Sequence, residues 1–239
     1  YQRKMNTLNC KGKLIDLSSP KVMGVLNITP DSFYDGGKYI DEKSILQQTK
    51  KMLSEGATFI DIGAYSSRPG ATHISEMEEM KRILPVLELL QINFPNILIS
   101  IDTFRSKIAQ KCIENGAAMI NDISGGNADT QMFETVAKLQ VPYIAMHMQG
   151  TPQNMQNNPT YKDIVQEILK EFSQTAFTLK SLGLINLVFD VGFGFGKTIE
   201  HNYELLQNLE LFQNLNCPIL TGISRKSMLY KPLGTTPQE

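Results

Sequence analysis

The stretch VMGVLNITPDSFYDGG, residues 22–37, indicates the fold of the whole chain. Its first five residues form a short apolar run with β-branched valines, which is typical of a strand that is buried on both faces. The chain becomes polar and glycine-rich from Asn27, and a helical pattern follows over residues 41–55. The stretch therefore predicts a unit made of a buried strand, a polar loop at its carboxyl end and a helix.

This unit recurs along the chain. The strand candidates are the short apolar segments 22–26, 58–62, 97–101, 118–121, 141–146, 186–189 and 218–221. The helix candidates, with apolar residues at helical spacing, are 43–53, 75–92, 106–115, 129–138, 161–182 and 200–211. Strands that alternate with helices form parallel sheets with right-handed crossovers. Seven units in 239 residues favour an α/β fold of the (β/α)₈ TIM-barrel type over an open doubly wound sheet.

The two ends of the chain add to this prediction. Residues 6–19 alternate polar and apolar around Lys11-Gly12-Lys13, which predicts an N-terminal β-hairpin. No linker interrupts the pattern, so we expect a single domain over residues 1–239. The strand count is one short of eight, and a barrel without one strand would expose two long edges. We therefore expect the C-terminal strand and its helix to be missing from this chain.

Composition excludes several classes of function. The chain has 23 basic and 24 acidic residues, so its charge does not predict binding to nucleic acid or to an anionic membrane. No apolar run approaches the roughly 18 residues of a membrane span. The three cysteines are far apart, which predicts free thiols in a reducing cytoplasm and neither disulfides nor a zinc site.

Polar side chains gather where the predicted strands end, which is where barrel enzymes place their active sites. These positions are Asn27, Asp61, residues 66–70, Asp102, Asn121, Asp122, Met146, His147, Asp190 and residues 224–227. Any one aspartate could equally be a structural cap. As a set they favour a function, because half-buried carboxylates without partners cost several kcal/mol.

Seven of these blocks carry a family resemblance. They are LNITPDSF (26–33), SSRPGA (66–71), SIDT (100–103), INDISGG (120–126), MHMQGTP (146–152), DVGFGFGK (190–197) and GISRKS (222–227). In this order they resemble the dihydropteroate synthases, folate-pathway enzymes of the wider pterin-binding barrel family. The resemblance implies a transferase that joins hydroxymethyl-dihydropterin pyrophosphate to para-aminobenzoate and releases pyrophosphate. It also implies Mg²⁺ as cofactor, sulfonamides as competitive inhibitors, and a homodimer.

The resemblance assigns a role to each matching residue. The implied pterin ligands are Asp102, Asn121, Met146, Asp190, Phe195, Gly222 and Lys226. The implied pyrophosphate ligands are Asn27, Ser67 and Arg68, with Asn27 also at the Mg²⁺ position. The implied para-aminobenzoate contacts are Phe33, Pro69, Lys226 and Ser227. The implied catalytic residues are Asp35, Arg68, Asp102 and Lys226.

The residue types fit these roles. A carboxylate such as Asp190 can accept two N–H groups from the edge of a pterin, while Asn121 offers a donor and an acceptor. Phe195 or Met146 can pack against the ring face. Arg68 is a permanently charged phosphate ligand, and the amide oxygen of Asn27 is a hard ligand that suits Mg²⁺.

Three other functions compete with this interpretation. A methyltetrahydrofolate-dependent methyltransferase would share the pterin pocket but would not need the TPDSF and SRPG blocks. A non-catalytic pterin-binding paralogue would be indicated by loss of Asn27, Arg68 or Lys226, and all three are present. A nucleotide-binding loop is suggested by residues 192–198, GFGFGKT, but Val191 stands where that motif needs glycine.

Two local features depart from the family pattern. Residues 63–67 read GAYSS where many members have GGEST, so Tyr65 adds bulk at the base of a predicted phosphate loop. Val191 stands where proline is usual. For His147, at a strand end, a structural hydrogen-bonding role is favoured over that of a catalytic base.

Overall fold

A parallel sheet of seven strands forms the centre of the computed structural model, which describes residues 7–29, 34–35, 39–66, 73–152, 154–155 and 158–237. The order across this sheet is β11-β10-β9-β8-β7-β6-β3, so neighbours in the chain are neighbours in the sheet. The bounds are β3 (Val22–Asn27), β6 (Ala57–Gly63), β7 (Leu98–Asp102), β8 (Met119–Asp122), β9 (Tyr143–Met146), β10 (Leu187–Asp190) and β11 (Ile219–Leu220).

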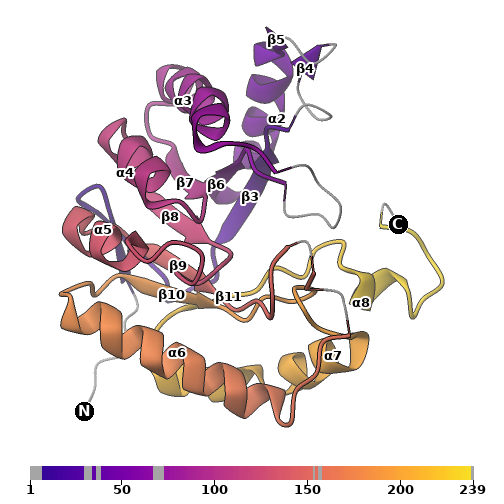
Figure 1. Ribbon diagram of the computed structural model, residues 1–239. Helices are drawn as coiled ribbons and strands as arrows, with labels where there is room; N and C mark the ends of the chain where they lie inside the picture. The colour runs from indigo at the N-terminus through magenta and orange to yellow at the C-terminus, as the bar shows by residue number, and fades with distance from the viewer. Residues whose placement is uncertain are drawn as a thin grey trace.

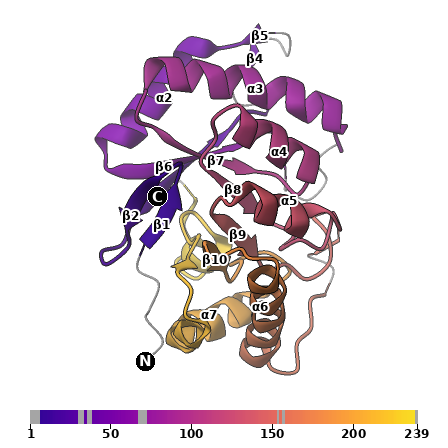
Figure 2. The ribbon, with the colours of Figure 1, turned by 90° about the vertical axis from the view of Figure 1, so that its left-hand side faces the viewer.

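Helices follow the strands in turn and cover the outer face of the curled sheet. Their bounds are α2 (Glu42–Ser54), α3 (Glu76–Asn93), α4 (Ser106–Glu114), α5 (Met132–Leu139), α6 (Ile164–Ser181), α7 (Ile199–Gln207) and the short α8 (Ser227–Tyr230), with a 3₁₀-helix η1 (Leu209–Leu215) after α7. Figure 2 shows α2 to α7 in chain order around the strands, and Figure 1 shows the same layers from the side. This is the predicted TIM-barrel arrangement, with seven strands in the described part of the chain.

Alternate residues of each strand face two different apolar layers. Ile60, Ile62 and Ile101 are fully buried between the sheet and the helices. Phe59 and Leu98 belong to a second cluster on the inner side of the curled sheet. This period of two is what a strand produces when both of its faces are covered.

The N-terminal hairpin closes one end of the inner cluster. It comprises β1 (Thr7–Cys10) and β2 (Lys13–Asp16), as predicted, and Lys11 and Gly12 turn the chain with φ of 56° and 80°. Leu8, Cys10 and Ile15 pack into the inner cluster. The polar strand ends are therefore left at the opposite, carboxyl end of the sheet.

Three expectations are corrected. Val22 and Val25 are 59% and 58% exposed, because β3 pairs only with β6 among the described strands. The segment expected as a loop after Asn27 contains a short antiparallel pair, β4 (Tyr34–Asp35) with β5 (Tyr39–Ile40). The helix expected over 200–211 ends at Gln207, and a 3₁₀-helix replaces its last turn.

Three of the helices are followed by glycines in a left-handed conformation. Gly56, Gly116 and Gly183 follow α2, α4 and α6 with φ between 86° and 105°, a region that disfavours residues with a side chain. Across the described ranges, no helix combines the length and the apolar character that a bilayer span requires.

Candidate active site

Four neighbouring strands end in one row of polar positions. Strand register pairs Asn27 with Gly63, Gly63 with Asp102, and Asp102 with Asn121. A Cβ atom at Gly63 would lie 3.1 Å from Asp102 Oδ2 and 3.3 Å from Asn27 Oδ1. Glycine therefore lets the amide of Asn27 and the carboxylate of Asp102 approach each other across the intervening strand.

A buried carboxylate supports this row from within the barrel. Asp61 lies two residues before Gly63, so both face inward, and it is 3% exposed. Asn121 Nδ2 donates to Asp61 Oδ2 at 2.9 Å. This bond fixes the orientation of the amide, because a carboxylate only accepts hydrogen bonds. The Asn121 carbonyl oxygen is thereby directed away from Asp61.

Burial and negative neighbours raise the pKa values of these acids. Burial is the main cause for Asp61, opposed by the nearby Ser100 hydroxyl and by the hydrogen bond from Asn121. For Asp102, burial together with the negative charges of Asp61, Glu79 and Asp122 holds the pKa well above its usual value. The ionised form of Asp102 is therefore costly, and a cation or an N–H donor placed next to it would stabilise that form.

A second polar cluster lies at the end of β10. Asp190 pairs in register with Met146 and is 8% exposed, and its Oδ1 accepts from the Gly192 N–H at 2.8 Å. Burial raises the pKa of Asp190 to about 6, while the positive charges of Lys226 and Lys197 act in the opposite direction. The two clusters lie close enough to interact, since the negative charge of Asp61 also raises the pKa of Asp190.

Lys226 provides a cation beside this carboxylate. Its Nζ lies 4.3 Å from the centroid of the half-buried Phe195 ring, in cation–π geometry. Burial lowers the pKa of Lys226 and the Asp190 charge raises it. Four predicted pterin residues, Asp190, Met146, Phe195 and Lys226, are thus brought together. Gly222, after β11, is exposed.

Asp122 follows Asn121 but faces the other side of the sheet. Its carboxylate accepts from Ser124 Oγ at 2.7 Å, from the Gly126 N–H at 3.0 Å and from Tyr143 Oη at 2.8 Å. These bonds fold the loop after β8. The structural interpretation of a strand-end aspartate therefore holds for Asp122, while Asp102 and Asp190 face the row of site residues.

The segment 192–198 does not offer its lysine to a phosphate. Lys197 is 4% exposed, and its Nζ donates to the backbone oxygens of His147, Gly192 and Phe195 and contacts His147 Nδ1. A nucleotide-binding loop would present this ammonium outward. His147 is likewise a buried hydrogen-bonding residue, as predicted.

The residues just before and just after the predicted phosphate loop are held in place by side-chain interactions. Tyr65, before the loop, places its hydroxyl 3.1 Å from His73 Nδ1, which follows the loop. Arg105 Nη2 donates to the Ile74 carbonyl at 2.6 Å, and Nη1 pairs with the buried Glu79 carboxylate at 2.5 Å. The large side chain of Tyr65 therefore contacts His73 at the far end of the loop.

The side chains of several predicted site residues lie outside the described part of the chain. Phe33, Ser67, Arg68 and Pro69 are not among the described residues, and Asp35 is described only through its backbone in β4. Ser227 is the first residue of α8. The roles of these residues remain predictions.

Asp61 and Gly63 are the residues that sequence reasoning leaves without a role. Asp61 stands at a predicted strand end, but its bond to Asn121 depends on the register between β6 and β8 through β7. The sequence feature that indicates a place for Asp61 in the site is its spacing from Gly63 and the polar loop, because strand positions two apart face the same side.

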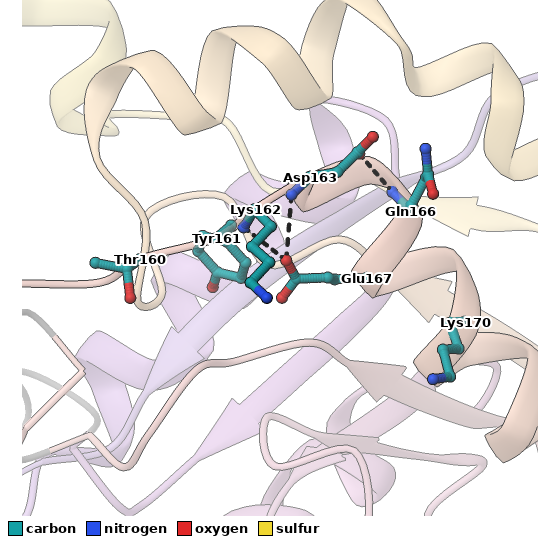
Figure 3. Close-up of a pocket in the computed structure, with 7 residues that line it drawn as sticks. All are labelled: Thr160, Tyr161, Lys162, Asp163, Gln166, Glu167 and Lys170. Carbon is teal, nitrogen blue, oxygen red and sulfur yellow. Dashed lines mark hydrogen bonds between the residues drawn. The ribbon is translucent and has the colours of Figure 1, made fainter.

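Figure 3 shows a hollow lined by residues at the start of α6, and its lining includes none of the strand-end residues. Glu167 Oε1 accepts from the N–H groups of Lys162 and Asp163, and Asp163 Oδ1 accepts from the Gln166 N–H at 2.9 Å. These bonds satisfy the free donors at a helix N-terminus. Helix capping explains the polar lining of this hollow.

The metal expectation rests on the strand-end row. Over the described ranges, no three His, Cys, Asp or Glu side chains gather into a metal-binding group. The oxygens of Asn27 and Asp102 flank Gly63 and are hard ligands. Mg²⁺ is usually held by one or two such groups together with substrate phosphates and water, so the residues fit this ion.

Comparison with known proteins gives a consistent result. The family model described as pterin binding enzyme matches residues 23–239. The dihydropteroate synthase of Haemophilus influenzae is 44% identical over 224 residues, which cover 93% of this chain and 81% of the relative.

Solved structures agree in fold. The Yersinia pestis dihydropteroate synthase with a sulfonamide drug complex superposes with a TM-score of 0.89 at 42% identity, covering 97% of this chain and 84% of the other. The Xanthomonas albilineans dihydropteroate synthase with 4-aminobenzoic acid gives 0.88 at 35% identity, covering 98% and 84%. The chain therefore belongs to the pterin binding enzyme family.

Proposed function

We propose that this chain is a dihydropteroate synthase, which condenses hydroxymethyl-dihydropterin pyrophosphate with para-aminobenzoate and releases pyrophosphate. The observation that carries the proposal is the meeting of two polar clusters at the carboxyl end of one barrel. Asp102 and Asn121 form one cluster, and Asp190 with Lys226 forms the other. Relatives at about 40% identity with this name support the assignment.

The pterin is proposed to lie between these clusters. Asp190 accepts two N–H groups from the edge of the ring, and the Asn121 carbonyl oxygen, directed away from Asp61, accepts another. Lys226 donates to a ring oxygen or nitrogen, while Phe195 and Met146 contact the ring faces. Burial of these groups makes an unpaired donor costly and the pocket selective for the pterin edge.

We propose a dissociative substitution at the methylene carbon. The bond to the leaving pyrophosphate breaks first, and the positive charge that develops is conjugated with the dihydropterin ring. The ionised form of Asp102 stabilises this charge, and the developing cation in turn favours that form, which burial and the neighbouring acids otherwise disfavour. The amine nitrogen of para-aminobenzoate then forms the new bond to the methylene carbon and gives up a proton to solvent water.

Arg68, with Asn27 and Ser67, is proposed to bind the pyrophosphate through its charge and planar donors. Asn27 would hold Mg²⁺ together with the substrate, and a bound Mg²⁺ supplies Lewis-acid neutralisation of pyrophosphate charge. Phe33, Pro69, Lys226 and Ser227 are the proposed para-aminobenzoate contacts, and Asp35 is assigned to the same closed site. The same region would bind sulfonamides.

A cytoplasmic homodimer is part of the proposal. Cys10, Cys112 and Cys217 are buried free thiols, which supports a reducing compartment. Light scattering on the purified protein measures the assembly, and a mass of one chain at micromolar concentration would contradict the dimer.

The test of the reaction is pyrophosphate release by the full-length gene product. The reaction contains hydroxymethyl-dihydropterin pyrophosphate and Mg²⁺, with or without para-aminobenzoate. We expect release to depend on para-aminobenzoate. Pterin binding without release would favour a non-catalytic paralogue or a methyltransferase.

The division of roles is tested with two variants. Asp190→Ala should lose pterin binding, because it removes the acceptor for the ring edge. Arg68→Ala should mainly lose turnover, because it removes a cation that faces the leaving group. Equal losses of pterin affinity in both variants would contradict this division.

A further inference from the structure

Lys197 is a buried amine that the proposed chemistry does not use; burial lowers its pKa to about 7, while the negative charges of Asp190 and Glu171 favour its ammonium form. Its Nζ lies 2.9 Å from His147 Nδ1, and 3.2, 3.0 and 3.0 Å from the carbonyl oxygens of His147, Gly192 and Phe195. An ammonium has three N–H donors and no acceptor, so four surrounding acceptors satisfy it fully. Burial of a charged group is costly unless hydrogen bonds of this kind replace its lost hydration.

These contacts join three points that border the proposed ring pocket. His147 follows the last residue of β9, Gly192 lies two residues after Asp190, and Phe195 provides the ring beneath Lys226. The Gly192 N–H also donates to Asp190 Oδ1 at 2.8 Å. A shift of Gly192 would therefore move a hydrogen-bond donor of the carboxylate that is proposed to bind the pterin.

The backbone at Gly192 has no room for such a shift toward β9. Its φ is +67°, and a Cβ atom there would lie 2.0 Å from the His147 carbonyl oxygen. The loop after β10 thus packs directly on the end of β9, and the ammonium of Lys197 bonds both sides of that contact. The loop is held further by Gly194, whose N–H donates to Asn202 Oδ1 at 2.8 Å.

His147 is arranged to accept from this ammonium. Because Lys197 donates to Nδ1, the neutral ring carries its proton on Nε2, which lies 3.8 Å from Glu171 Oε2. Burial and the Lys197 charge lower the pKa of His147 to about 3. The imidazole is therefore neutral throughout the range in which most enzymes work, and it accepts from Lys197 where that amine is protonated.

We propose that Lys197 and His147 act together as positioning residues, which hold the loop after β10 so that Asp190 and Phe195 stand correctly for the pterin ring. The inference rests on the proposed function, since it names the ring pocket of that reaction. A positioning role differs from a purely structural one. In a purely structural role, loss of the pair would lower stability but leave the folded protein with its full affinity for the ring.

The experiment compares four variants with the wild type. Lys197→Met removes the donors, His147→Leu removes the side-chain acceptor, and His147→Asn restores an acceptor close to the position of Nδ1. Lys180→Met is the matched control, because Lys180 is exposed in the last turn of α6. The measurements are the dissociation constant for 6-hydroxymethylpterin by calorimetry, the KM for para-aminobenzoate at saturating pterin substrate, and the Tm.

We expect Lys197→Met and His147→Leu to raise the dissociation constant for the pterin roughly 10- to 100-fold, since a misplaced Asp190 would lose about one charge-assisted hydrogen bond to the ring. His147→Asn and Lys180→Met should stay near the wild type, and the KM for para-aminobenzoate should change little in all four. If Lys197→Met fails to fold, the comparison of His147→Leu with His147→Asn tests the inference.

Two results would overturn the inference. One is a lowered Tm with unchanged pterin affinity in Lys197→Met and His147→Leu. The other is equal loss of affinity in His147→Asn and His147→Leu, which would show that the acceptor is irrelevant. A wild-type protein that does not bind the pterin would instead refute the proposed function.

Discussion

Replacing Asp190 by asparagine should make the protein more stable and less able to bind its substrate. Folding raises the pKa of Asp190 from 3.8 to about 6. Between these pH values the folded state retains a proton that the unfolded state releases, so the free energy of unfolding falls as the pH rises through this window. The ionised carboxylate therefore destabilises the folded protein at neutral pH.

The size of the effect follows from the shift. One pKa unit corresponds to about 1.4 kcal/mol, so the full shift destabilises the wild type by about 3 kcal/mol. An asparagine in place of Asp190 would keep an oxygen for the Gly192 N–H but would carry no charge. The advantage of Asp190→Asn should grow from about 1 kcal/mol at pH 4.5 to about 3 kcal/mol at pH 8.

The same substitution removes the charge-assisted bonds proposed for the pterin edge. Hydrogen bonds to charged groups contribute about 1.5–3 kcal/mol each, so affinity should fall roughly 100-fold. The variant would thus exchange function for stability, as expected for a site that holds a desolvated charge ready for a ligand.

Urea unfolding between pH 4.5 and 8 measures the first effect, and calorimetry with 6-hydroxymethylpterin measures the second. Glu88→Gln is the control, because it removes a carboxylate from an exposed position on α3. Parallel stability profiles for Asp190→Asn and the wild type would refute the reasoning, since they would show that folding does not destabilise the Asp190 charge.

Three further results are expected. Glu79→Ala should lower the free energy of unfolding by about 3–5 kcal/mol, because it leaves the Arg105 guanidinium without its buried partner; a loss below about 1 kcal/mol in urea unfolding would contradict this. Tyr143→Phe should cost about 1.5–3 kcal/mol through the lost bond to Asp122, and an unchanged Tm would argue against that bond. A sulfonamide should compete with para-aminobenzoate, so its binding constant, measured by calorimetry, should weaken as para-aminobenzoate is added; binding that is insensitive to saturating para-aminobenzoate would refute a shared site.

Much of the fold was predictable because local and global signals agree. Buried apolar segments of strand length alternate with helices that end at glycines such as Gly56, and this pattern permits few topologies. The exposure of Val25 was not predictable, because the identity of an edge strand depends on what pairs beside it. The end of α7 depended on Asn208, whose side chain bonds the Glu204 carbonyl.

The site was predictable as residue types and only partly as contacts. Asp102, Asn121, Asp190 and Lys226 lie at strand ends, where the barrel rule places them. Their partners come from other strands, and strand register cannot be obtained from composition. Lys197 shows this limit most clearly, because its sequence context resembles a phosphate loop while its ammonium faces inward.

The Arg105–Glu79 pair has a consequence for how this protein can change. Arg105, held by Glu79, donates to the Ile74 carbonyl, and the Tyr65 hydroxyl contacts His73. The residues at which the chain leaves and rejoins the barrel are therefore neighbours whose positions are fixed. The entropy of closing a segment between fixed ends grows slowly, by about 0.6 kcal/mol for each doubling of its length. Insertions between residues 66 and 73 should therefore leave the barrel folded, so that this segment can diverge in length and chemistry independently of the scaffold that holds the ring.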